Sequence, residues 1–126
     1  MQKNIIHTNL APEAIGPYSQ AVEVDGVIYT SGQIGLNPET GELAEGVEDQ
    51  AHQVMKNVSA VLEAAGADTS TIIKALIFLQ NMDDFTVVNE IYASYLQEPY
   101  PARSAVEISR MPKGALVEVE VIAKKA

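Results

Sequence analysis

Arg103 lies in the segment Pro101-Ala102-Arg103-Ser104 of a chain that has two arginines in all and a net charge of −9. Residues 102 to 108 alternate between the two faces expected of a β-strand, with Arg103 on one of them. The planar guanidinium of arginine binds a carboxylate through two hydrogen bonds and does not lose its charge. Arg103 is therefore a candidate for binding an anionic ligand, and a structural ion pair is the alternative.

The last strand-like segment, residues 116 to 123, carries Glu118 and Glu120 between valines. Side chains alternate along a strand, so the valines should face a covered side of the sheet and the glutamates an open side. A glutamate in an apolar environment has a raised pKa and exchanges protons near neutral pH. If residues 102 to 108 pair antiparallel with this segment, Arg103 joins the glutamates in one cleft, although a one-residue slip reverses the faces. Catalysis and a structural charge cluster both remain open.

Three other polar residues are weaker candidates for a ligand site. Tyr18 follows Gly16-Pro17, and Ser31 precedes Gly32, at the ends of predicted strands. Glycine at such positions allows a ligand to approach the backbone closely. Asn89 lies on a predicted helix, where an amide at the edge of the core is the alternative. Each of these residues also suits a purely structural role.

Composition excludes several classes of protein. The 126 residues suit a single domain, residues 1–126, around one core. There is no cysteine, and His7 and His52 lack the spacing of metal ligands, so we expect no metal site. With 17 acidic residues against 8 basic ones, nucleic acid is an unlikely partner. We also expect no membrane association and a cytoplasmic location, since the chain shows neither a spanning apolar stretch nor a signal-peptide pattern.

The hydrophobic pattern predicts an α+β fold with the element order β-β-β-α-β-α-β-β. The expected strands are residues 3–8, 21–24, 27–30, 72–79, 102–108 and 116–123, with a hairpin turn at Asp25-Gly26. The expected helices run from about Val47 to a stop at Gly66, and from a cap at Asp83 to before Pro99. Right-handed crossovers then place both helices on one face of a single mixed sheet. Residues 72–79 are almost all apolar, so this strand should be central, and its uncovered face predicts a second copy of the chain as its cover.

Five short motifs occur together in this chain and in a fixed order. They are Ala14-Ile15-Gly16-Pro17-Tyr18-Ser19-Gln20, Ser31-Gly32-Gln33-Ile34, Val87-Val88-Asn89-Glu90, Pro101-Ala102-Arg103-Ser104 and Val117-Glu118-Val119. In this combination the chain resembles, nearly end to end, the Rid family of reactive intermediate deaminases, which hydrolyse 2-iminobutanoate and 2-iminopropanoate. The resemblance implies a chorismate-mutase-like fold that assembles as a homotrimer with three equivalent clefts between subunits.

The resemblance also implies roles for individual residues. Arg103 would bind the carboxylate of a small imino acid, and Glu118 would orient and activate water, so that the C=N bond is hydrolysed to a 2-keto acid and ammonia without a cofactor. The residues implied to line the cleft are Tyr18, Ser31, Gly32, Asn89 and Ala105. Many relatives carry cysteine at the position of Ala105, so thiol chemistry is not expected here.

Two other functions stay open at this point. The first is a non-enzymatic trimer that binds small carboxylates in the same clefts and acts as a regulator or a chaperone-like protein. Both readings need Arg103, but only the enzyme needs an ionisable Glu118. The second is the ribonuclease activity claimed for some relatives, which the acidic composition disfavours.

Overall fold

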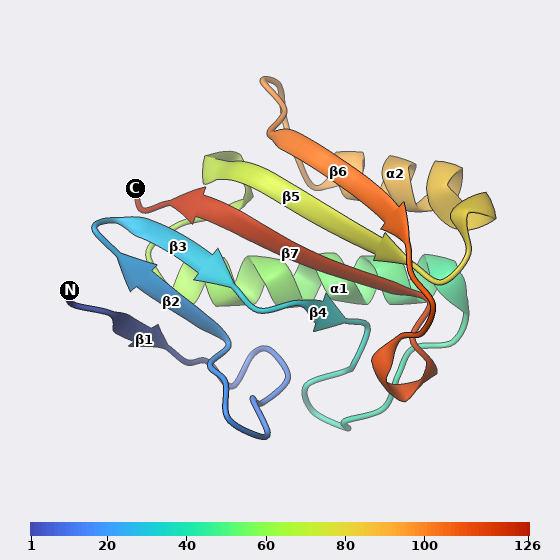
Figure 1. Cartoon of the computed structure of the whole chain (residues 1–126), viewed down its shortest axis with the longest axis horizontal. Coiled ribbons are helices and arrows are strands. Elements are labelled where there is room, and N and C mark those ends of the chain that lie inside the picture. Colours follow the sequence, from blue (N-terminus) through green and yellow to red (C-terminus); the bar gives the residue numbers. More distant parts are fainter.

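Alternating apolar and polar segments build one mixed β-sheet, and two amphipathic helices cover one of its faces (Figure 1). The structure, a computed structural model, describes residues 1–126. The strands are β1 (Asn4–Ile6), β2 (Ala21–Val24), β3 (Val27–Thr30), β4 (Gln33–Ile34), β5 (Ile72–Leu79), β6 (Ala102–Glu107) and β7 (Val117–Lys124). The helices are α1 (Gly46–Ala64) and α2 (Phe85–Ser94), and there are three short 3-10 turns, η1 (Thr69–Thr71), η2 (Met82–Asp84) and η3 (Pro112–Gly114). The predicted α+β class is confirmed, and so is the predicted element order apart from the additional strand β4.

The sheet has the order β1-β2-β3-β7-β5-β6, with β4 paired to β7 beyond the end of β3. All neighbouring strands are antiparallel except β5 and β6, which are parallel. The predicted hairpin is confirmed, because Asp25 and Gly26 join β2 to β3 with φ angles of 53° and 81°. Positive φ at both central residues matches the right-handed twist of the two strands.

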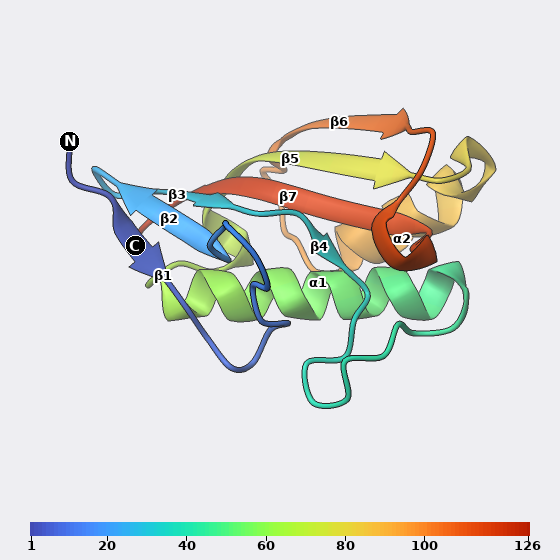
Figure 2. The same ribbon diagram turned by 60° about the horizontal axis from the view of Figure 1, so that its bottom comes forward.

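Both helices lie on the same side of the sheet, as predicted (Figure 2). The core between the helices and the sheet is a cluster of 23 buried residues. On β7 the residues that face the helices are buried and the intervening glutamates are not, so the expected faces of this strand are confirmed. Helix α1 ends beside Gly66, whose φ of +80° suits the residue that stops a helix.

The other face of the sheet is covered within this chain only at one end, where Ile34 and Phe78 pack against Met111 of the connection between β6 and β7. Tyr29, Ile73 and Val106 are 45%, 49% and 42% exposed on β3, β5 and β6. Strand β5 lies inside the sheet, but next to the edge strand β6, and β7 contacts three strands and is the more central. The prediction that β5 is central therefore holds only in part, because an apolar run reports burial and not the number of neighbours.

The predicted antiparallel pairing of the last two strands is wrong, because β5 lies between β6 and β7. Helix α2 connects β5 to β6, and a helical crossover of this kind brings two strands side by side in parallel. The segment from residue 108 to 116 therefore passes the end of β5 on its way to β7. Alternation along a strand shows its two faces, but it carries no information about which strand lies alongside.

Two local predictions also need correction. Asp83 does not cap α2; instead the Asn81 side chain accepts a hydrogen bond from the Asp83 backbone N–H at 2.9 Å and begins η2, which leads into the helix. Asn and Asp cap helices equally well, so the pattern alone did not choose between them. The sequence analysis also missed the two-residue strand β4, and it placed the first strand over residues 3–8, which is longer than the observed β1.

Candidate active site

Glu118 lies on β7 with its side chain on the open face of the sheet, between the buried Val117 and Val119. Its carboxyl group is half-buried. Burial raises the pKa of this carboxyl above its ordinary value, and the negative charge of Glu120 on the same face raises it further. A raised pKa makes a carboxylate a stronger base than an exposed glutamate, so Glu118 is suited to taking and returning a proton.

A cleft of about 740 Å³ opens beside Glu118, which is within the usual size of a small-molecule site. Four of the predicted site residues line this cleft together: Tyr18, Ser31, Gly32 and Glu118. The structure thus brings together residues that are up to 100 positions apart in the sequence.

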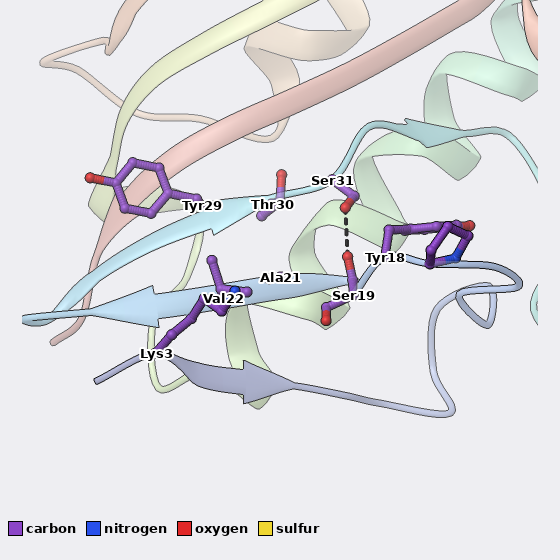
Figure 3. Close-up of a pocket in the computed structure, with 9 residues that line it drawn as sticks. Lys3, Tyr18, Ser19, Ala21, Val22, Tyr29, Thr30 and Ser31 are labelled. Atoms are coloured by element: carbon purple, nitrogen blue, oxygen red, sulfur yellow. Dashed lines mark hydrogen bonds between the residues drawn. The ribbon is translucent and has the colours of Figure 1, made fainter. Parts of the chain in front are cut away.

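Ser31 fixes one wall of this cleft. Its hydroxyl donates a hydrogen bond to the Ser19 carbonyl, and its backbone N–H donates to the Gln20 carbonyl at 2.9 Å. A second hollow of about 480 Å³ lies over β2 and β3, and Tyr18 and Ser31 are among its lining residues. Figure 3 shows these two side chains at the same end of the group of residues that line it. The two hollows share Tyr18 and Ser31, so this wall has a ligand-sized space on each side.

Arg103 lies on the opposite side of the sheet from Glu118. It pairs with Ala75 of β5, which faces the helices, whereas Glu118 pairs with Phe78 on the open face. The guanidinium carbon lies 5.0 Å from the centre of the Phe85 ring, and the guanidinium donates a hydrogen bond to the Asn89 side-chain oxygen. The expectation that Arg103 joins Glu118 within one chain is therefore wrong, as a direct result of the corrected strand order.

No carboxylate of the chain neutralises Arg103. The one ion pair in the structure joins His7 to Glu13 at 3.8 Å. A structural ion pair within the chain, the alternative for Arg103, is thus not present. The aromatic ring and the amide hold the guanidinium in place while leaving its charge available.

The remaining predicted residues lie with Arg103. Asn89 contacts it directly, and Ala105, two residues further along β6, packs against the main core on the same side of the sheet. The predicted residues therefore divide into two groups: the Glu118 group, with Tyr18, Ser31 and Gly32, and the Arg103 group, with Asn89 and Ala105.

Two aromatic residues of the Arg103 group were not predicted from the sequence. Phe85 and Tyr92 on α2 lie under the guanidinium, with the Tyr92 ring centre 5.9 Å from its carbon. A signal for them exists in the sequence, because positions 85, 89 and 92 share one face of a helix. Lys113 was also missed; it lines the Glu118 cleft, and nothing in its neighbourhood along the chain singles it out.

The structure shows neither a cluster of metal-ligating side chains nor a membrane-spanning helix. No group of three or more histidine, aspartate and glutamate side chains is placed to hold a metal ion. Neither helix has the length and apolar character that crossing a membrane requires.

Comparison with known proteins places the chain among relatives that match it over nearly their whole length. The family whose sequence model is described as Endoribonuclease L-PSP matches residues 8–125. The 2-iminobutanoate/2-iminopropanoate deaminase of Mus musculus is 48% identical over 122 residues, which cover 96% of this chain and 90% of that protein. The crystal structure of RidA from the Antarctic bacterium Psychrobacter sp. PAMC 21119 has a TM-score of 0.94 and 47% identity, covering 96% of this chain and 98% of that one. The structure of E. coli TdcF with bound serine has a TM-score of 0.92 and 42% identity, covering 98% and 99%. The chain belongs to the Rid family, also described as the endoribonuclease L-PSP family.

Proposed function

We propose that the chain is an imine deaminase that hydrolyses 2-iminobutanoate and 2-iminopropanoate to 2-keto acids and ammonia. The observation that carries this proposal is the Arg103 guanidinium, which is held by Phe85 and Asn89 and has no carboxylate partner in the chain. A fixed, unpaired guanidinium is suited to the carboxylate of a small acid. Several relatives bear the name 2-iminobutanoate/2-iminopropanoate deaminase, which supports the same substrate class.

We further propose that each site forms between two copies of the chain in a homotrimer. Arg103 and Glu118 lie on opposite faces of the sheet, so one copy cannot apply both groups to a substrate of a few atoms. The open face, with exposed Tyr29, Ile73 and Val106, supplies an apolar surface for a neighbouring copy. The Arg103 group of one copy would then meet the Glu118 group of the next.

The proposed reaction needs only binding, orientation and proton transfer. Arg103 binds the substrate carboxylate through two charge-assisted hydrogen bonds, while Asn89, Tyr18, Ser31 and the backbone at Gly32 surround the imine. The Glu118 carboxylate accepts a proton from water as the water oxygen bonds to the imine carbon. Glu118 returns this proton to the nitrogen, which gives a carbinolamine. Glu118 then takes the carbinolamine hydroxyl proton and passes it to the nitrogen as the C–N bond breaks, so that ammonia leaves and the carbonyl forms. The proposed steps balance with water, Arg103 and Glu118 alone, and they use no cofactor.

A second function, the binding of small carboxylates without turnover, is favoured by one observation. The E. coli relative was solved with serine bound, so a member of the family takes up a small amino acid. In this role the chain would act as a regulator or a chaperone-like protein. It needs Arg103 in the same way, but it gives no use to the raised pKa of Glu118.

The deciding experiment is a coupled assay with a threonine dehydratase, which releases the enamine precursor of 2-iminobutanoate. We expect faster formation of 2-ketobutyrate when the chain is added, and no acceleration when Glu118→Gln replaces it. Calorimetry with 2-ketobutyrate should show that Glu118→Gln still binds. If the parent binds the keto acid and does not accelerate its formation, the binding role is the correct one.

A further inference from the structure

A β-bulge lies directly beside Glu118. Strand β3 pairs with β7 through Tyr29 and Ile122, and β4 pairs with the same strand through Gln33 and Val119. Between these two pairs there are three residues on the β3–β4 side, Thr30–Gly32, and two on β7. One extra residue on one side of an antiparallel pair is the mark of a bulge.

The bulge decides which residue lies over Glu118. Tyr29 is on the open face, so without the extra residue the alternation would place Ser31 and Gln33 on that face as well. With the bulge, Gly32 and Ile34 lie there instead, and Ile34 pairs directly with Glu118. The residue that the bulge places beside the Glu118 side chain is therefore Gly32, which has no side chain of its own.

The Thr30 side chain closes the gap that the bulge leaves in the ladder. The Val121 backbone N–H donates to the Thr30 hydroxyl oxygen at 3.0 Å, and that hydroxyl lies 3.4 Å from the Val121 carbonyl, to which it donates. Both contacts are buried, and Thr30 itself is 9% exposed. Figure 3 shows the hydroxyls of Thr30 and Ser31 pointing in opposite directions, the second one toward Ser19. One hydroxyl thus ties the bulge to β7 and the other ties it to the loop before β2.

Gly32 leaves the space that the Glu118 carboxyl group occupies. A Cβ atom at position 32 would lie 2.6 Å from one carboxyl oxygen of Glu118 and 2.7 Å from its carboxyl carbon. Contacts below about 3 Å do not occur between such atoms, so either residue would have to move. The φ angle of Gly32 is not in the left-handed region, so backbone strain gives no reason for glycine here. The close contact with Glu118 is the reason for glycine at this position.

From these contacts we propose that the bulge at Thr30–Gly32 is a seat for the Glu118 carboxylate, with Thr30 and Gly32 as positioning residues. Thr30 fixes the bulge through Val121, the bulge places Gly32 on the open face, and Gly32 lets the carboxyl group lie against the backbone. This seat contributes to catalysis only if the proposed function holds, since it acts through Glu118. The position of the carboxyl group can be tested whether or not the chain is an enzyme.

The test is a titration of Glu118 by carbon NMR, with glutamate labelled at the side-chain carboxyl and the signal assigned through Glu118→Gln. Glu120 faces the same side of the sheet as Glu118, and Glu13 and Lys113 line the same cleft. Because these charged residues lie near Glu118, none of them is mutated in any variant. In Gly32→Ala the carboxyl group is displaced toward solvent, and its midpoint should return more than halfway to that of an exposed glutamate. Thr30→Val should shift the Glu118 midpoint in the same direction, because it leaves the Val121 N–H and carbonyl without their hydrogen-bond partner.

Two control variants separate the seat from general damage. Thr30→Ser keeps the hydroxyl and should keep the parent midpoint, which a role for the methyl group alone would not predict. Gly46→Ala adds a Cβ at a φ of +80° with no atom within 4 Å, so it strains the backbone without touching Glu118 and should also keep the midpoint. In the imine assay, Gly32→Ala should lower kcat by a larger factor than it raises KM, because Glu118 is displaced while Arg103 still binds the carboxylate.

Unchanged midpoints in both Gly32→Ala and Thr30→Val would overturn the proposal, as would an ordinary midpoint in the parent. A shift in Gly46→Ala as large as in Gly32→Ala would overturn it too, because the effect would then come from lost stability. If Thr30→Val does not fold, Gly32→Ala against Gly46→Ala still decides. A parent with no imine hydrolysis but a seat-dependent midpoint would refute the proposed function and leave the seat standing.

Discussion

Two inactive variants should restore activity when they are combined in one trimer. Arg103→Ala removes the group proposed to bind the substrate carboxylate, and Glu118→Gln removes the proposed base while keeping its shape. The two groups lie on opposite faces of the sheet, so a shared site takes Arg103 from one copy and Glu118 from its neighbour. In a mixed trimer, the Glu118→Gln copy still has Arg103, and the Arg103→Ala copy still has Glu118. A site between these two copies, with each supplying its intact group, is therefore complete.

The expected recovery follows from counting. In a ring of randomly mixed copies, the neighbour that provides the arginine is the right variant half of the time, and so is the neighbour that provides the glutamate, so about one quarter of all sites are complete. Loss of a general base alone lowers a rate by about 10²- to 10⁴-fold. A recovery to about 25% of parent activity therefore stands far above the background of either variant.

The assay is 2-ketobutyrate formation with a threonine dehydratase, after the two variants have been unfolded together and refolded, with each variant refolded alone as the control. Light scattering should confirm that all three samples have the parent mass, since either charge could also stabilise the interface. Recovery no higher than the sum of the separate variants, in samples that have exchanged subunits, would refute the shared site. At least one of the two groups would then lie outside the catalytic site, since a single copy holds them on opposite faces of the sheet.

Four further outcomes follow from the structure. Arg103→Lys keeps the charge but loses the planar pair of donors, so KM for the imine should rise about tenfold or more, as steady-state kinetics will show. The Tyr92 hydroxyl is buried without a hydrogen-bond partner, so Tyr92→Phe should increase the free energy of unfolding by about 1 kcal/mol in denaturant titrations at fixed protein concentration. Folding raises the pKa of Glu118, so the ionised carboxylate destabilises the folded state, fully above the raised pKa and not at all below the ordinary pKa of glutamate. Glu118→Gln should therefore melt at a higher temperature than the parent at pH 8, and the difference should disappear as the pH falls from the raised pKa through the ordinary one. Chelation with EDTA should leave imine hydrolysis unchanged, and a loss that a divalent metal restores would contradict the proposed mechanism.

The parts of the fold that sequence could predict are those set by local chemistry. Asp25-Gly26 requires two positive φ angles in a row, which fixes the hairpin and its register. The alternation of valine and glutamate on β7 gave the correct faces of Val119 and Glu118, because side-chain direction depends only on position along the strand. The cleft wall at Tyr18 and Ser31 was found for a similar reason, since glycine beside a strand end is a local feature.

The parts that sequence could not predict depend on which segments become neighbours. The packing of α2 decides whether β6 lies beside β7 or beside β5, and no residue of β6 itself indicates which strand is its neighbour. The bulge at Thr30–Gly32 was hidden for the same reason, since it exists only relative to the register of β7. The sequence contains the glycine, but the carboxyl group that needs it is 86 positions away.

The error in strand order also shows where a cation and a base should be sought in a chain of this kind. A search for both on one pair of strands assumes that a site belongs to one copy. Arg103 is held by side chains on one face of α2, and Glu118 lies in the space left by the glycine of the adjoining segment. Each group is therefore positioned by elements on its own side of the sheet. Neither group needs the other in order to be placed. The Arg103 group and the Glu118 group can therefore be preorganised in every copy before assembly. In the proposed trimer, the contact between copies has only to bring the Arg103 group of one copy to the Glu118 group of the next.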